Sequence, residues 1–152
     1  MKELLEHLFE HAHWANRRVL ASLQAGSPSE DAVRLFAHVL TTERIYHERV
    51  SGKDPWPQDF WPELSLHECG EFVPGNHELY RSFFRVNSEK ELHKPVRYRN
   101  SKGTVFYTPL RDMLMHLTLH GEHHRGQIAR IVRGFGEKPA VTDFITFCRE
   151  QD

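Results

Sequence analysis

Apolar residues recur along most of the chain at the three- and four-residue spacing that is typical of amphipathic helices. The first run covers residues 4–23 and is followed by Gly26 and a Ser-Pro-Ser sequence, which predicts a turn and then a helix cap. A second run covers about 29–51 and stops at Gly52, before a proline-rich segment. A further run starts near position 109 and continues to about 134. The pattern predicts three long helices in these segments.

The segment from about 64 to 86 is harder to interpret. Its second half has helical spacing, with apolar or aromatic residues at positions 79, 80, 83 and 84. The Pro74-Gly75 pair lies in the middle, and proline removes a backbone donor and clashes with the preceding turn. We therefore expect a helix here that is kinked, interrupted or delayed by Pro74.

Two short alternating segments, 95–99 and 104–107, flank Asn100-Ser-Lys-Gly103 and predict a β-hairpin. The tail from Pro139 onward carries enough apolar residues for a short packed helix. No linker, repeat or low-complexity tract divides the sequence. The expected fold is an all-α four-helix bundle in one domain, residues 1–152, with a hairpin before the fourth helix and a short C-terminal helix.

Composition narrows the classes of partner. The 152 residues include 20 Lys and Arg and 21 Asp and Glu, for a formal net charge of -1, and the two signs are interspersed. Such a surface does not favour nucleic acid, and no apolar run is long enough for a membrane span or signal segment. Cys69 and Cys148 form no C-x-x-C motif and are expected to be reduced thiols. We expect a cytoplasmic protein that does not bind nucleic acid or a membrane.

Histidines are concentrated in the last long helix, at positions 116, 120, 123 and 124. Imidazole is a common ligand of divalent metals, and two histidines four residues apart on a helix face the same point. A helical wheel places His124 within the apolar arc and His120 at its edge, whereas His116 and His123 turn toward solvent. Gly121 also falls on the buried face, where it is expected to leave room beside the two rings. The pattern therefore predicts a metal site built on His120 and His124.

A third ligand is expected from another helix, and the sequence offers several. His38 and His47 lie in the second helix, and the first helix has histidines at positions 7, 11 and 13. His38 and His47 are nine residues apart and project in nearly opposite directions, so at most one of them faces the bundle centre. Hydrophobic periodicity alone favours His47, which is nearer the strongest apolar arc.

Two motifs resemble those of the DinB/YfiT-like family. His120-Gly-Glu-His-His124-Arg-Gly-Gln127 is similar to the family's H-x-x-x-H-R-G-Q sequence, and His38 is followed by an acidic residue and an aromatic, as in the family's second helix. Trp14-Ala-Asn-Arg and the segment 139–145 also resemble the two ends of family members. In the family these histidines bind a divalent metal, so the resemblance implies His38, His120 and His124 as the ligands, against the periodicity that favours His47.

Three imidazoles leave at least one coordination position open, which is typical of a catalytic site rather than a closed structural one. Water or a substrate thiolate are the expected occupants, and zinc or nickel the expected metals. The family resemblance implies a thiol-dependent transferase or a hydrolase acting on a small molecule, with a low-molecular-weight thiol as a possible cosubstrate. The alternative is a non-catalytic bundle that binds metal for storage, sensing or partner interaction. A homodimer is expected in either case.

Supporting roles fall to residues near the predicted ligands. Glu43, just over one turn beyond His38, is the candidate catalytic residue, because a carboxylate there can orient a ligand imidazole or move a proton. Arg125 and Gln127 follow the ligand pair and are expected to form hydrogen bonds, chiefly structural, between helices. The remaining histidines of the last helix are expected to stay at the surface or outside the ligand set.

Overall fold

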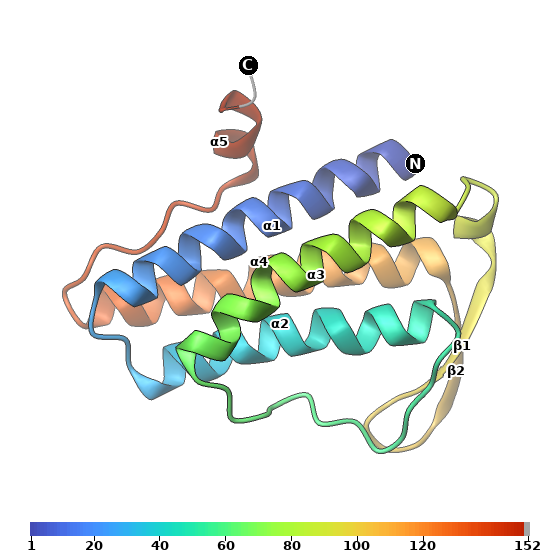
Figure 1. Cartoon of the computed structure of the whole chain (residues 1–152), viewed down its shortest axis with the longest axis horizontal. Helices are drawn as coiled ribbons and strands as arrows, with labels where there is room; N and C mark the ends of the chain where they lie inside the picture. Colours follow the sequence, from blue (N-terminus) through green and yellow to red (C-terminus); the bar gives the residue numbers. More distant parts are fainter. Residues whose placement is uncertain (151–152) are drawn as a thin grey trace.

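The computed structural model describes residues 1–150, and four long helices run side by side along its length (Figure 1). These helices are α1 (Lys2–Ala25), α2 (Glu30–Val50), α3 (Leu66–Val86) and α4 (Leu110–Gly134). A short helix, α5 (Phe144–Arg149), follows after an extended segment and packs against α1. The predicted all-α bundle, its hairpin and its C-terminal helix are confirmed. None of the helices within residues 1–150 is both long and apolar enough to cross a bilayer.

Local signals explain the ends of the helices. The hydroxyl of Ser29 accepts a hydrogen bond from the Ala32 amide at the start of α2, as the Ser-Pro-Ser turn predicts. At the start of α3, Ser65 and Glu68 form a capping box, with the side chain of each bonded to the backbone of the other.

The expected interruption or delay of the third helix is wrong, because α3 is continuous from Leu66 to Val86 and contains Pro74, whereas a kink at Pro74 stays a prediction. Initiation at Ser65 precedes the proline by two turns. Packing of α3 against both α1 and α2 then offsets the loss of one backbone hydrogen bond.

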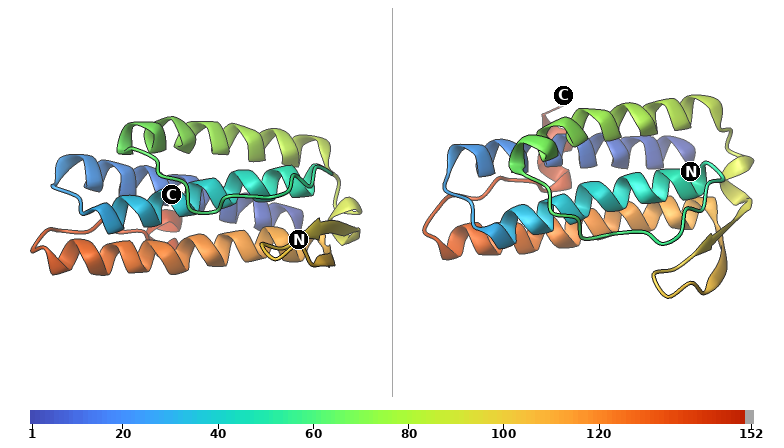
Figure 2. Two further views of the ribbon diagram at one scale, coloured as in Figure 1. Left: turned by 90° about the horizontal axis from the view of Figure 1, so that it is seen from below. Right: turned by 60° about the horizontal axis from the view of Figure 1, so that its bottom comes forward.

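Two connections lie beside α2 and α4. Strands β1 (Pro95–Arg99) and β2 (Val105–Pro109) form an antiparallel hairpin in which Arg97 pairs with Tyr107, and a 3-10 turn (Glu91–His93) precedes it. The segment 51–65 leaves the end of α2 and runs back along that helix before α3 begins, as the two views of Figure 2 show. This connection and the hairpin flank the face where α2 meets α4.

The hydrophobic core is divided into two clusters. One contains residues such as Val19, Phe36 and Ile128, and the other contains residues such as Leu5, Phe84 and Leu114. Between them a polar layer crosses the bundle, formed by Asn16 of α1, Glu43 of α2, Asn76 of α3 and Arg125 of α4. Along the sequences of α2 and α4, the candidate metal ligands lie close to the residues that form this layer.

Candidate metal centre

His38, His120 and His124 come together between α2 and α4. Each offers one ring nitrogen, and the three nitrogens all lie within 4.8 Å of one another. The Nε2 atoms of His38 and His120 are 3.1 Å apart, and the His124 ring centroid lies 4.4 Å from that of His120. Three imidazole nitrogens that converge in this way fit one divalent cation of the zinc or nickel type. Among residues 1–150 no other group of three such side chains meets the same criterion.

The second ring nitrogen of His38 is fixed by the connection between α2 and α3. His38 Nδ1 lies 2.7 Å from the Phe60 carbonyl oxygen, which leaves Nε2 to face His120. The Trp61 indole stacks on the same imidazole, with ring centroids 3.7 Å apart and planes 2° from parallel. A carbonyl that accepts the outer N–H of a ligand histidine fixes its tautomer and orientation. Residues 60 and 61 therefore orient His38 before any ion is present.

His124 has a similar outer contact within α4. Its Nδ1 lies 2.7 Å from Gln127 Oε1, so its Nε2 is free to point toward the other two rings. Gln127 Nε2 in turn lies 3.2 Å from His123 Nε2. The sequence prediction that Gln127 bonds between helices is therefore wrong, because its amide supports a ligand on its own helix.

Burial favours the neutral form of His38 and His120. Burial, together with the neighbouring imidazoles of His124 and His38, lowers the pKa of His120 to about 3. Burial also lowers the pKa of His38, in spite of the opposing effect of the Phe60 carbonyl. Neutral imidazole is the form that binds a cation, so the lowered pKa of His120 leaves its ring available as a ligand well below neutral pH, and the pKa of His38 is shifted in the same direction.

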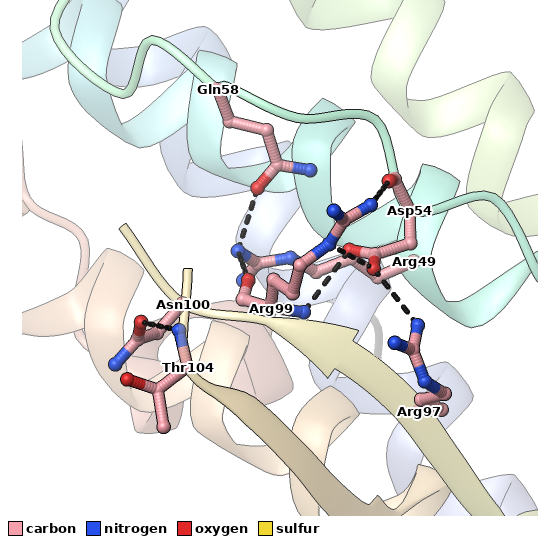
Figure 3. Close-up of polar contacts among 7 residues, drawn as sticks. All are labelled: Arg49, Asp54, Gln58, Arg97, Arg99, Asn100 and Thr104. Atoms are coloured by element: carbon pink, nitrogen blue, oxygen red, sulfur yellow. Dashed lines mark hydrogen bonds and ion pairs between the residues drawn. The ribbon is translucent and has the colours of Figure 1, made fainter. Parts of the chain in front are cut away.

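Arg49 holds the connection that carries Phe60 and Trp61. Its side chain is buried, and Nη2 donates to Gln58 Oε1 and to the Arg99 carbonyl, both at 2.6 Å. Its guanidinium also lies 5.2 Å from the centre of the Phe60 ring. Figure 3 shows this cluster between the end of α2, the connection and the hairpin. One buried cation thus ties three segments together beside the metal centre.

Asp54 reinforces the same cluster from the connection. Its carboxylate accepts bonds from the Arg99 backbone N–H at 3.1 Å and from Arg99 Nε at 2.9 Å, and Arg97 Nη1 lies 3.3 Å away (Figure 3). Desolvation is the largest single effect and raises the pKa of Asp54, but the hydrogen bonds from Arg99 and the charges of Arg99 and Arg97 together outweigh it, so the pKa is lowered overall. The hairpin is thereby fastened to residues 54–58.

Glu43 lies apart from the three histidines. Its Oε1 accepts from Asn16 Nδ2 at 2.9 Å and its Oε2 from Asn76 Nδ2 at 2.7 Å, whereas the described contacts of the His38 ring nitrogens are with Phe60 and His120. Glu43 follows His38 by five residues, or about 500° of helical rotation, and so leaves the α4 face. Orientation of the ligand imidazole falls to a backbone carbonyl instead of Glu43.

The Glu43 carboxyl belongs to the polar layer of the bundle. Arg125 Nη1 donates to Asn16 Oδ1 at 3.1 Å, and Arg44 Nε donates to Asn76 Oδ1 at 2.8 Å. Burial raises the pKa of Glu43, and the two amide hydrogen bonds oppose this shift. The predicted bond from Arg125 to another helix is present, and it reaches α1.

The remaining predicted candidates lie elsewhere. His47 packs edge-on against Tyr80 and Phe83 of α3, at 5.5 and 6.2 Å between ring centroids, and so faces away from α4. His116 and His123 are exposed, in agreement with the wheel. The histidines of α1 at positions 7, 11 and 13 lie toward α5 and α3. His38 is thus the histidine that α2 contributes, as the family resemblance implied and periodicity did not.

The space left by the absence of a side chain at Gly121 is occupied by Arg125. A Cβ atom at this position would lie 2.8 Å from Arg125 Nη1. The missing side chain therefore makes space for the buried guanidinium that reaches Asn16.

A partly enclosed cavity of about 320 Å³ lies on another side of the bundle, between α1 and α3. Its lining includes Phe9, His13, Glu43, His77 and Tyr80, and none of the three metal-site histidines. The His13 and His77 rings stack at 3.8 Å, and His77 Nε2 lies 2.9 Å from a Glu10 carboxylate oxygen. The candidate site is therefore identified by its three histidine donors on α2 and α4, and not by the presence of a cavity.

Sequence reasoning missed the parts played by Arg49, Phe60 and Trp61. They lie at the end of a helix and in a connection, where helical periodicity carries no information. One signal was present: the proline-rich connection contains Trp56, Phe60 and Trp61, although connections are usually polar.

Comparison with known proteins agrees with the geometry. The whole chain, residues 1–152, matches the DinB family. It is also 30% identical over 162 residues to Protein DinB of Bacillus subtilis (strain 168), an alignment that covers 95% of this chain and 93% of the relative. The match includes the helices that carry His38, His120 and His124. With its helical bundle, its hairpin before α4 and its three converging histidines, the chain belongs to the DinB family.

Proposed function

We propose that this protein binds one divalent metal ion through His38, His120 and His124 and uses it for chemistry on a small molecule. The single observation that carries the proposal is the convergence of three ring nitrogens within 4.8 Å. The outer contacts of His38 with Phe60 and of His124 with Gln127 support it, because such contacts are typical of metal-ligating histidines.

An enzymatic role fits this donor set better than a structural one. Three protein ligands leave room for a water or a substrate atom, whereas structural sites are usually closed by four. When bound, the metal supplies Lewis acidity to whatever occupies the open position. Thiol-dependent transfer and hydrolysis are the two reaction classes that we propose, with zinc or nickel as the metal and a low-molecular-weight thiol as cosubstrate in the first class.

The protein's own residues would prepare the site for that chemistry. Trp61 covers one face of His38, and the Phe60 carbonyl holds its Nδ1 proton. Imidazole binds a metal in its neutral form, so three histidine ligands would leave the full charge of the ion to act on a substrate. The same proposal includes a cytoplasmic location, a homodimer and a small-molecule substrate. In this proposal the part of Glu43 is to stabilise the bundle.

Cobalt substitution tests the proposal. One Co²⁺ per chain should give visible absorption bands of a four- or five-coordinate centre, and a small thiol such as 2-mercaptoethanol should add a thiolate charge-transfer band. A matched His47→Ala variant should give the same spectra, and His120→Ala should give neither. A cobalt spectrum that no thiol, anion or pH change alters would indicate a closed site and contradict the enzymatic proposal.

A further inference from the structure

An open groove of about 660 Å³ lies between α2 and α4, next to residues that contact the metal-site histidines. Trp61 and Gln127, which contact His38 and His124 respectively, form part of its wall. Further from the histidines the groove is lined by Leu35 and Ile131 and by three charged side chains, Asp31, Arg34 and Arg130. One end of the groove therefore lies beside the outer contacts of the metal-site histidines, and the other end is charged.

The charged end has a net positive charge. Arg34 and Arg130 are both exposed, and among residues 1–150 neither guanidinium takes part in an ion pair within 4.0 Å. Asp31 is the only carboxylate in the described lining of the groove, so one negative charge faces two positive ones. Two guanidiniums on opposite walls are suited to bind a carboxylate or a phosphate between them.

The spacing along the helices places this end at a useful distance from the ligands. Arg34 precedes His38 by four residues, which is about 6 Å along α2, and Arg130 follows His124 by six residues, which is about 9 Å along α4. Trp61 links the two ends on the α2 side, because it stacks on His38 and its ring centre also lies 5.5 Å from the Arg34 guanidinium. This spacing is comparable to the length of a short organic molecule.

We infer that the substrate of the metal centre is a small organic acid whose anionic group lies between Arg34 and Arg130 while its reacting end reaches the metal. This inference rests on the proposed function for the reacting end, and on the groove and its two free guanidiniums for the anionic end. The apolar walls formed by Leu35, Ile131 and Trp61 fit a short hydrocarbon segment between the two ends.

Glutarate, a five-carbon dicarboxylate, is a suitable probe, with glutaramide as its uncharged counterpart. Isothermal titration of the zinc-loaded protein should show glutarate binding at least about tenfold tighter than glutaramide. Arg34→Met and Arg130→Met should each weaken glutarate binding by about tenfold or more and leave glutaramide unchanged. Arg17→Met, an exposed arginine of α1 outside the groove, is the matched control and should bind glutarate normally.

Two results would overturn the inference: glutarate binding that is equal in the Arg34, Arg130 and Arg17 variants, or no preference for glutarate over glutaramide. A failure of the proposed function would look different. In that case the protein would take up no zinc, yet glutarate would still bind and would still depend on Arg34 and Arg130, which would support the anion site. Raised ionic strength should weaken the binding in every case where the arginines are responsible.

Discussion

The imidazole of His38 and the indole of Trp61 lie parallel, with ring planes 2° apart and centroids 3.7 Å apart. The Phe60 carbonyl, 2.7 Å from His38 Nδ1, fixes the same ring from its edge. A ligand that is held in its binding orientation loses little conformational entropy when an ion arrives. The connection between α2 and α3 is therefore expected to raise the affinity of the proposed site for a metal without supplying a ligand.

Trp61→Leu should weaken metal binding by about tenfold, because the His38 ring then gains rotational freedom. Competition of Co²⁺ against a chromophoric chelator measures this change. Trp14→Leu, which removes a tryptophan bonded to Glu150 on another part of the molecule, should leave the affinity unaltered. Equal affinities in the Trp61 variant and the unmodified protein would show that the stacked ring has no such role.

Arg49→Met should weaken metal binding by about tenfold and lower the free energy of unfolding by about 1–3 kcal/mol, because it leaves the Gln58 side chain and the Arg99 carbonyl without their donor. Urea denaturation of the metal-free protein and the chelator competition measure the two effects separately. Arg97→Met removes an exposed arginine of the same cluster and should change both quantities little. A loss of stability with unchanged affinity would restrict Arg49 to a structural role.

Glu43→Gln should lower the free energy of unfolding by about 1–3 kcal/mol. The new amide nitrogen would face the donating Nδ2 of either Asn16 or Asn76, so that two donors would meet and one hydrogen bond would be lost. Metal content should stay at the level of the unmodified protein, since the carboxyl makes no described contact with the three histidines. Glu71→Gln, at an exposed position on α3, is the control for stability. Loss of the metal at unchanged stability would instead place Glu43 in the metal centre.

Acid should destabilise the protein partly through His13. Burial, with the nearby His77 and Arg17, lowers the pKa of His13 from 6.5 to about 4. Between these values the unfolded chain binds a proton that the folded one does not, so stability is lost as pH falls from about 6.5 to about 4. In metal-free protein, His13→Gln should reduce this loss, and His67→Gln, at an exposed site, should not. The same pH dependence in both variants would contradict the assignment.

Much of the fold followed from periodicity and helix-end signals. The bounds of α1, α2, α4 and the hairpin agree with the sequence pattern to within a few residues, and α5 lies in the tail where a short helix was expected. The fate of Pro74 did not follow, because a proline acts on one turn, whereas the helix is stabilised by packing along its whole length. Tertiary contacts of this kind are not visible in local sequence.

The candidate site was predictable only in part. The i, i+4 pair His120 and His124 was visible from its own helix, since both rings fall near one apolar face. The choice between His38 and His47 was not, because α2 is buried on several sides: His47 packs against α3 and His38 faces α4. Periodicity reports burial and does not say which neighbour buries a residue, so the family resemblance was needed for that step.

Metal stoichiometry tests the central claim most directly. Elemental analysis of tag-free protein, after loading with zinc and removal of excess ion, should give one zinc per chain for the unmodified protein and for His47→Ala. His38→Ala, His120→Ala and His124→Ala should each give little or none, while circular dichroism shows an intact helical bundle. Equal zinc content in the His38 and unmodified proteins, or none in the unmodified protein after loading, would contradict the three-histidine metal centre.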